Sequence, residues 1–166
     1  MAPTSRNFRI RHHLKPGDLG MVVHLHGIVY AREYGLDTTF EPYVAKPLAE
    51  FVLGGSGRLW IAEEDDHIVG SIAMLDCGSG MGQIRWFLLV PEARGSGLGK
   101  RLLEEALSHA RRLHLRHIFL WSFADLNDAR RLYEHAGFKT TETKRGLIWG
   151  AERTEVRMDL ALEPLG

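Results

Sequence analysis

The sequence predicts an α/β fold of the α+β type, with four helices packed on a central mixed, mostly antiparallel sheet of about seven strands. Three features indicate it. The apolar run at 86–90 is too short for a helix and is typical of a buried strand. A glycine-rich turn at 94–99 then opens a helix with one apolar stripe. Elsewhere, strand-like and helix-like periodicities follow one another in the order β-α-α-β-β-β-α-β-α-β-β.

The N-terminal part of the chain predicts one strand and one helix. Residues 8–11 alternate between apolar and basic side chains, as a strand with one buried face does. Residues 16–18, Pro-Gly-Asp, then begin a helix that we expect to reach about residue 34. The inward stripe of this helix carries two polar residues, His26 and Glu33, among apolar ones.

A second helix and a β-hairpin follow. Thr38 and Glu41 have the spacing of a capping box at the start of the helix, and Pro47 should kink or split it. The apolar segments 59–62 and 68–75 flank an acidic turn and predict the two strands of the hairpin. We expect the four carboxylates of that turn to be solvated.

The central strand is expected to end at Pro91, which cannot donate to a sheet ladder. The helix after it starts near Leu98, and the next strand should return through a right-handed crossover. Gly137 fits the position just after the last helix. The remaining strands are expected at 118–121, 138–143 and 151–160, the last helix at 125–136, and a loop at 144–150.

Composition favours one soluble domain over the whole chain, 1–166, with a core at about 8–161. The chain has 21 basic and 21 acidic residues, so nothing indicates a nucleic-acid or membrane surface. No apolar run approaches the ~20 residues that span a bilayer, and the N-terminus lacks the apolar core of a signal peptide. Cys77 is the single cysteine, so we expect no internal disulfide and a cytoplasmic location.

The junction at 94–100 has the properties of an anion site. The first N–H groups of a helix have no internal partner, and the helix dipole places partial positive charge beside them. Glycine lets the backbone take positive φ and approach a ligand, while Arg94 and Lys100 add full charges. The turn therefore predicts a phosphate or diphosphate site; the alternative is a glycine-rich turn without a ligand.

Two common phosphate loops do not fit this junction. A P-loop would need Gly at position 94 and Ser or Thr at position 101, and both positions are Arg. The dinucleotide pattern G-x-G-x-x-G is not met, because the glycines are Gly95, Gly97 and Gly99.

The pattern Arg94-x-x-Gly97-x-Gly99 resembles the acetyl-CoA diphosphate loop of the GCN5-related N-acetyltransferase (GNAT) family. A second segment, Ala129-x-x-Leu132-Tyr133-x-x-x-Gly137-Phe138, is similar to the last helix and following strand of that family. The likeness covers about residues 8–161. More narrowly, the chain resembles the acetyltransferase half of bacterial proteins fused to a MarR-type regulator, whose DNA-binding half is not seen in this sequence.

The resemblance implies transfer of an acetyl group from acetyl-CoA to a primary amine, on a small molecule or a peptide, by direct attack. The backbone near Leu88, Leu89 and Val90 would pair with the pantetheine arm, and an N–H near Leu89 would bind the thioester oxygen. The diphosphate would be held by the seven residues Arg94, Gly95, Ser96, Gly97, Leu98, Gly99 and Lys100.

The resemblance also implies two proton-transfer roles. Tyr133 occupies the position of the family's acid that protonates the leaving thiolate, although it also completes the apolar stripe of its helix. The base is more open, because the central strand lacks the carboxylate that some relatives carry. Glu33 is the predicted base, with His26, Glu41 or a water chain as alternatives.

One further cofactor contact is predicted at Asn127. The family often has Asn seven residues before the tyrosine, but that position is Leu126 here. Asn127 is one residue later, so it either contacts the cofactor or caps the helix.

The acceptor pocket is expected to lie between residues 26–41 and the loop 144–150, lined by Tyr30, Tyr34, Trp86 and Trp149. We therefore expect an amine on an apolar or planar body. The nine histidines lack ligand spacing, so no metal is expected.

Three alternatives stay open at this point. The protein could be a non-catalytic acetyl-CoA-binding regulatory module, or an enzyme that uses a longer acyl-CoA. A homodimer is also compatible with the sequence.

Overall fold

Within residues 5–164, seven strands form one sheet in the order β1-β2-β3-β4-β5-β7-β6, and four helices cover it, which confirms the predicted fold class and element order. The computed structural model describes residues 5–164, so part of the N-terminal segment expected to lack a signal peptide lies outside the described residues. Within that range, no helix is both long and apolar enough to cross a bilayer. The elements are β1 (Phe8–Arg11), α1 (Asp18–Tyr34), α2 (Phe40–Gly54), β2 (Gly57–Glu64), β3 (His67–Asp76), β4 (Met81–Leu89), a 3₁₀ turn (Pro91–Ala93), α3 (Leu98–Arg112), β5 (His117–Phe123), α4 (Asn127–His135), β6 (Lys139–Ile148) and β7 (Ala151–Ala161).

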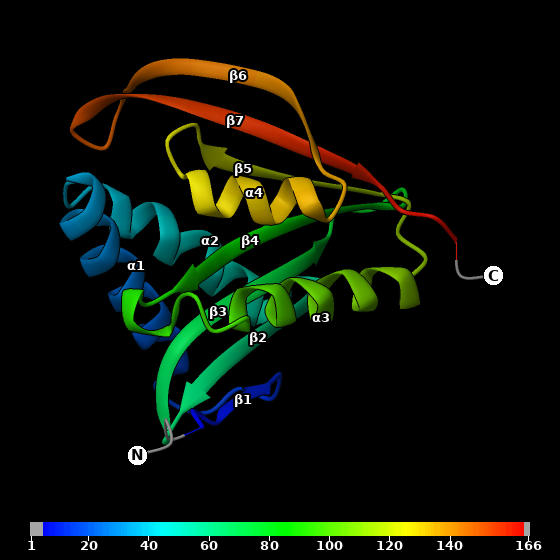
Figure 1. Ribbon diagram of the computed structural model, residues 1–166, viewed down its shortest axis with the longest axis horizontal. Coiled ribbons are helices and arrows are strands. Elements are labelled where there is room, and N and C mark those ends of the chain that lie inside the picture. The colour runs from blue at the N-terminus through cyan, green and yellow to red at the C-terminus, as the bar shows by residue number, and fades with distance from the viewer. Residues whose placement is uncertain (1–4, 165–166) are drawn as a thin grey trace.

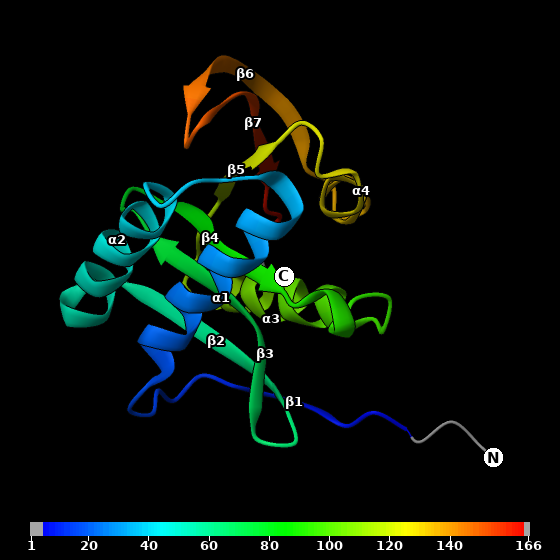
Figure 2. The ribbon, with the colours of Figure 1, turned by 90° about the vertical axis from the view of Figure 1, so that its left-hand side faces the viewer.

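Helices cover both faces of the sheet. α1 and α2 lie on one face, and α3 and α4 lie on the other (Figures 1 and 2). Each face has its own cluster of buried apolar residues. On the α3 face, the apolar stripe of the helix is fully buried, as an amphipathic helix on a sheet requires; its residues are Leu98, Leu102, Leu103, Ala106, Leu107 and Ala110. On the other face, Val44 and Leu48 of α2 share a cluster with Trp86 of β4.

The two central strands separate along their length. β4 and β5 run parallel, but they pair only where Met81–Gln83 meets His117–Phe119. Beyond Gln83, the edge of β4 that faces β5 has no strand partner, and the two ribbons diverge (Figure 1). An open strand edge presents unpaired N–H and C=O groups to whatever lies in the gap.

The predicted loop at 144–150 is wrong. β6 continues to Ile148 and pairs with β7 up to the contact between Ile148 and Ala151, so only Trp149 and Gly150 form the turn. The reason is that β6 is an edge strand at the outside of the sheet (Figure 1), and all its residues except Ile148 are exposed. A strand without a buried face shows no apolar alternation for sequence analysis to detect.

The capping box expected at the start of α2 is also wrong. Thr39 is the N-cap and makes no capping bond, while the carboxylate of Asp37 accepts from the backbone N–H and the hydroxyl of Thr39. Pro47 does not split the helix, which runs unbroken from Phe40 to Gly54. Burial of Val44 and Leu48 on either side of Pro47 holds the two halves against the sheet.

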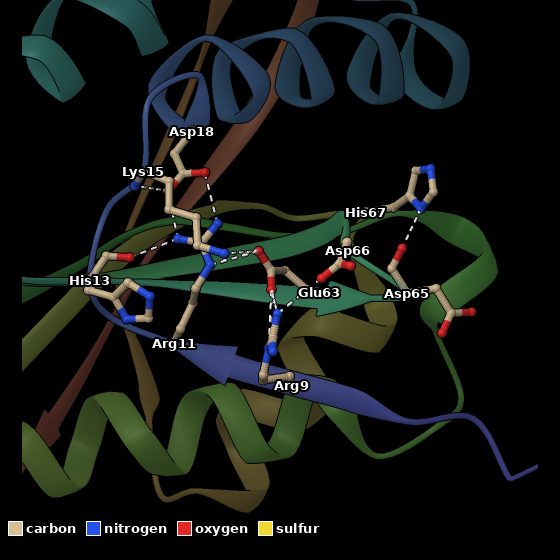
Figure 3. Close-up of polar contacts among 9 residues, drawn as sticks. All are labelled: Arg9, Arg11, His13, Lys15, Asp18, Glu63, Asp65, Asp66 and His67. Atoms are coloured by element: carbon tan, nitrogen blue, oxygen red, sulfur yellow. Dashed lines mark hydrogen bonds and ion pairs between the residues drawn. The ribbon is translucent and has the colours of Figure 1, made fainter.

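A buried ion-pair network fixes the start of α1 (Figure 3). The Arg11 guanidinium donates to both oxygens of Asp18 at 2.6 and 2.8 Å and to Glu63 Oε1 at 2.7 Å. Arg9 donates to the other Glu63 oxygen at 2.8 Å, and the Lys15 backbone N–H donates to Asp18 at 2.7 Å. Because Arg11, Asp18 and Glu63 come from β1, α1 and β2, the network sets how α1 leaves the sheet.

We expect acid to destabilise the fold through this network. Arg9 donation lowers the pKa of Glu63, burial opposes that lowering, and Arg11 adds to it. Burial raises the pKa of Asp18, but donation from Arg11 and from the Lys15 N–H outweighs it, so its pKa is lowered as well. A lowered carboxyl pKa contributes stability that is complete above the unfolded-chain pKa and is lost as pH falls through the folded-state pKa.

The free energy of unfolding can be measured by urea titration at a series of pH values. It should decrease as the pH drops below the ordinary carboxyl pKa values, 4.5 for Glu63 and 3.8 for Asp18. The Glu63→Gln variant should be less stable than the wild type at neutral pH, and its free energy of unfolding should decrease less steeply as the pH is lowered. If the free energy of unfolding had the same pH dependence in the wild type and in Glu63→Gln, Glu63 would not be a source of the acid sensitivity.

Candidate active site

A cavity of about 880 Å³ occupies the gap between β4 and β5. One end reaches the turn at the start of α3, with Gly97 and Lys100 in its lining. The other end lies between α1, α2 and the β6–β7 turn, with Tyr30 and Trp149 in its lining. The cavity therefore joins the predicted anion site to the predicted acceptor pocket.

The turn before α3 offers a row of backbone donors. The N–H groups of Gly95, Ser96, Gly97, Gly99 and Lys100 have no hydrogen-bond partner among residues 5–164. Gly97 has φ +83° with open space around it, and a Cβ at Gly99 would lie 3.3 Å from a Leu89 methyl group. Such a set of amides at a helix N-terminus is an anion-binding geometry.

Arg94 and Glu33 contact each other beside this turn. Arg94 Nη1 lies 2.6 Å from Glu33 Oε1, and its other nitrogens donate to the Leu89 carbonyl at 3.1 and 3.3 Å. Glu33, the predicted base, lies next to the cavity but is not one of its lining residues. Its carboxylate is therefore paired with a cation and does not face the reaction space in this structure.

A bulge shapes the middle of β4. Ser71 pairs with Leu88 and Ala73 with Arg85, so two β4 residues, Trp86 and Phe87, oppose one residue of β3. Trp86 has φ +48°, which is strained for a residue with a side chain, and its carbonyl accepts from Ser71 Oγ at 2.7 Å.

Beyond the bulge, the backbone of β4 turns a donor toward the gap. The Val90 N–H donates to the Val69 carbonyl of the neighbouring β3 at 2.9 Å. Because backbone groups alternate sides along a strand, those of Leu89 face the gap instead. The strand therefore presents the Leu89 N–H, and not that of Val90, to a ligand lying in the gap.

Tyr133 reaches the same gap from α4. Its ring packs against Phe87 of β4 at 6.0 Å and against Phe138 at 5.8 Å, and its hydroxyl makes no hydrogen bond to any residue within 5–164. Burial raises the pKa of Tyr133 well above its usual value, with a smaller contribution from Tyr30. The phenol is therefore protonated, and a donor, at neutral pH.

The predicted site residues divide into two groups. Val90 does not line the cavity, because its N–H bonds to β3 and its carbonyl accepts from the Ala93 N–H. Ser96 and Leu98 support the turn from behind, since Ser96 Oγ donates to the Ala93 carbonyl and the Leu98 side chain is buried in the core. The predicted residues that do line the cavity are Leu88, Leu89, Arg94, Gly95, Gly97, Gly99, Lys100, Asn127 and Tyr133.

Asn127 is not a helix cap. The N-cap of α4 is Leu126, which makes no side-chain capping bond, and Asn127 is the first residue of the helix. Since Asn127 lines the cavity, its side chain is placed to meet a ligand.

Comparison with known proteins identifies the fold. The model of the Acetyltransferase (GNAT) family matches residues 23–138. The chain belongs to this family. An uncharacterised N-acetyltransferase of Schizosaccharomyces pombe is 30% identical over 119 residues, which are 68% of this chain and 72% of that protein. The uncharacterised N-acetyltransferase YjgM of Escherichia coli is 32% identical over 133 residues, 76% of this chain and 79% of that protein.

Solved structures share the architecture of this GNAT chain. The structure of yncA from Salmonella typhimurium with its cofactor acetyl-CoA superposes with a TM-score of 0.74, at 19% identity, and 94% of each chain is covered. At that identity, the likeness shows the fold.

The end of the cavity where the sequence predicts the acceptor has an aromatic lining. Tyr30, Tyr34, Trp86 and Trp149 all line it. The β6–β7 turn closes this end, because the Asp37 N–H donates to the Trp149 carbonyl at 3.0 Å. The sequence therefore identified the wall of this pocket, although it misjudged the strand that carries Trp149.

Sequence analysis missed a carboxylate at this end. Glu155 of β7 lines the cavity, and nothing in the sequence of this largely half-buried strand indicated it. His26, an alternative base, is buried and its pKa is lowered to about 4 by burial, although a bond to the Val22 carbonyl opposes that change. Its Nδ1 lies 2.7 Å from the Val22 carbonyl, which only accepts, so the neutral ring carries its proton on Nδ1.

Among residues 5–164, no three or more His, Cys, Asp or Glu side chains are grouped so that they could hold a metal ion.

Proposed function

We propose that this protein transfers an acetyl group from acetyl-CoA to a primary amine by direct attack. The observation that carries the proposal is the open edge of β4, which lies between a turn of unpaired amides and an aromatic pocket. Membership of the acetyltransferase family supports the reaction class, and the relative from Salmonella is described with acetyl-CoA.

The cofactor would lie along the gap. The N–H groups of the turn, with Arg94 and Lys100, would bind the diphosphate. The open edge of β4 beyond Gln83, which includes the Leu89 N–H but not the backbone of Leu88, would pair with the amides of the pantetheine arm, as an added strand does. This arrangement places the thioester near Phe87 and Tyr133, where α4 meets β4.

The chemistry then needs few protein groups. The amine attacks the thioester carbon, a C–N bond forms and the C–S bond breaks. The Leu89 N–H would bind the oxygen on which negative charge develops, and Tyr133 would donate a proton to the departing thiolate. Glu33 remains a proposed base. It would become free to accept a proton only when Arg94 breaks its ion pair with Glu33 and binds the diphosphate instead.

Two measurements test the proposal. Calorimetry should detect binding of acetyl-CoA and of coenzyme A, and a thiol reagent should detect coenzyme A release when primary amines are added to the acetyl-CoA complex. Lack of affinity for both cofactor forms would remove the proposed site. Binding without thiol release from any amine would remove the proposed reaction.

The Gly97→Val variant should bind acetyl-CoA at least about tenfold more weakly. At φ +83°, a β-branched residue is strained, and relief of that strain redirects the neighbouring N–H groups. Gly146→Val is the matched control, because Gly146 lies in exposed β6 with open space and without positive φ. The affinity of Gly146→Val for acetyl-CoA, measured by the same calorimetry, should equal that of the wild type. If Gly97→Val also bound acetyl-CoA as tightly as the wild type, the proposed role of the turn would be contradicted.

A second candidate is a non-catalytic acetyl-CoA-binding module, as the likeness to regulator-fused acetyltransferases suggests. The pairing of Glu33 with Arg94 favours it, because the predicted base is held outside the cavity. Tight binding of acetyl-CoA with no thiol release over a broad amine panel would select this candidate.

A further inference from the structure

Glu155 differs from the other acidic residues of the cavity. Three carboxylates line it, and two of them, Asp125 and Asp128, are exposed near the start of α4. Glu155 is half-buried on β7, directly opposite Phe123 of β5 on one side and Lys144 of β6 on the other. It is thus the carboxylate most withdrawn from solvent in the cavity.

Glu155 also lacks a protein partner. The buried carboxylates of Asp18 and Glu63 are each held by an arginine, and Asp159 is held by Arg157. No hydrogen bond or ion pair joins Glu155 to any residue in the described range 5–164, and burial raises its pKa, against an opposing effect of Lys144. Lys144 is a nearby positive charge but forms no ion pair with Glu155, and a partly desolvated acid without a direct partner is costly unless a ligand supplies one.

Aromatic rings cluster around Phe123, the cross-strand neighbour of Glu155, and line the same cavity. Phe123 lies 5.7 Å from Trp149 and 6.3 Å from Tyr30, and Trp149 lies 4.8 Å from Tyr43. Aromatic faces attract ammonium groups, and aromatic walls also favour an apolar body.

Fixed positive charges flank the same end. Arg85 lies over the rings of Tyr43 and Trp86 at 5.9 and 4.9 Å, and Lys144 lies over Trp121 at 4.5 Å. These groups would repel a second positive charge on the ligand. One unpaired carboxylate between fixed cations therefore suits a ligand with a single ammonium group.

We propose that Glu155 binds the ammonium group of a monocationic primary amine with an aromatic or aliphatic body, and accepts its proton before the amine attacks. This inference deepens the proposed acetyl transfer and depends on it for the proton step. The ammonium gives one proton to the Glu155 carboxylate, and the neutral amine forms the C–N bond. The thiolate leaves with the electrons of the C–S bond. Tyr133 donates its proton to the thiolate and receives the second proton from the nitrogen. Glu155 returns the first proton to solvent.

The test compares four proteins and three ligands. The proteins are the wild type, Glu155→Gln, Glu155→Asp, and Glu152→Gln as a matched control on the exposed part of β7. The ligands are 2-phenylethylamine, spermidine and phenylalanine, which carry one ammonium, three cationic amines, and an ammonium beside a carboxylate. Thiol release gives kcat/KM over a range of pH, and calorimetry gives the affinity of each amine for the coenzyme A complex.

We expect the wild type to favour 2-phenylethylamine. Glu155→Gln should lower kcat/KM for it about 100-fold and weaken its binding about tenfold, whereas Glu152→Gln should stay within about twofold. In the wild type, kcat/KM should rise on the acid side of neutrality as Glu155 ionises, and Glu155→Gln should lose that rise. Glu155→Asp should recover part of the activity. Other titratable or charged groups at this end are Lys144, Arg153, Arg85, Asp125, His26, Tyr30, Tyr34 and Tyr43, and all are unchanged in these variants.

The outcomes separate the two proposals. If Glu155→Gln had the same kcat/KM as the wild type, the role of Glu155 would be overturned while acetyl transfer would stand. A preference of the wild type for spermidine over 2-phenylethylamine would lead to the same conclusion. Binding of 2-phenylethylamine that depends on Glu155, without thiol release, would support the ammonium site and overturn both the proton step and the transfer reaction.

Discussion

The Tyr133→Phe variant is expected to bind acetyl-CoA as tightly as the wild type and to release coenzyme A about 100-fold more slowly. The substitution removes one hydroxyl, and that hydroxyl makes no hydrogen bond within residues 5–164. The ring contacts with Phe87 and Phe138 remain, so the free energy of unfolding should change by less than about 1 kcal/mol. A loss of turnover without a loss of stability or affinity would therefore report proton donation.

The matched control is Tyr43→Phe. Tyr43 also lines the cavity, but it is 50% exposed and lies at the acceptor end, away from the junction of α4 and β4. Its kcat should stay within about threefold of the wild-type value. If Tyr133→Phe kept the wild-type kcat with the best amine, proton donation by Tyr133 would be excluded.

The Arg11→Met variant is expected to lose about 3–5 kcal/mol of unfolding free energy. Removal of the guanidinium leaves Asp18 and Glu63 buried and without their shared cation, and buried unpaired charge is more costly than the lost contact itself. Urea denaturation followed by circular dichroism measures the change. If the variant does not fold, Asp18→Asn, which removes one carboxylate and keeps the arginine, should still show a smaller loss.

The control for Arg11→Met is Arg9→Met in the same strand. The Arg9 side chain is 61% exposed, although it too contacts Glu63. An exposed pair contributes at most about 1 kcal/mol, so this variant should be the milder one by a wide margin. Equal losses in the two variants would show that the network acts as a surface cluster and does not anchor α1.

Most of the fold was predictable because its signals are local. The stripe from Leu98 to Ala110, the stop at Pro91 and the glycine at Gly137 each follow from periodicity or backbone chemistry within one element. The errors fell where tertiary contacts override such signals. β6 has no buried face, and packing of Val44 and Leu48 keeps α2 continuous across a proline.

The active-site prediction divides in the same way. The anion turn was predicted because its glycines and basic residues are consecutive. Val90 was assigned to the cofactor edge, but the alternation of β4 and its bulge at Trp86 turn Leu89 toward the gap instead. Glu33 was selected as a base from its helical stripe, and no pattern in the sequence could show that Arg94 binds it.

The sequence by itself determined the family and predicted the anion turn at the start of α3, since both depend on residues that are neighbours along the chain. Only the tertiary structure decided which side chains meet in the acceptor end. Glu155 reaches the cavity because β7 inserts between β5 and β6, and β4 has a free edge because it separates from β5 after Gln83. Contacts between elements far apart in the chain leave no periodic trace in either partner, so three-dimensional packing alone brings a carboxylate, an aromatic wall and an open strand edge together.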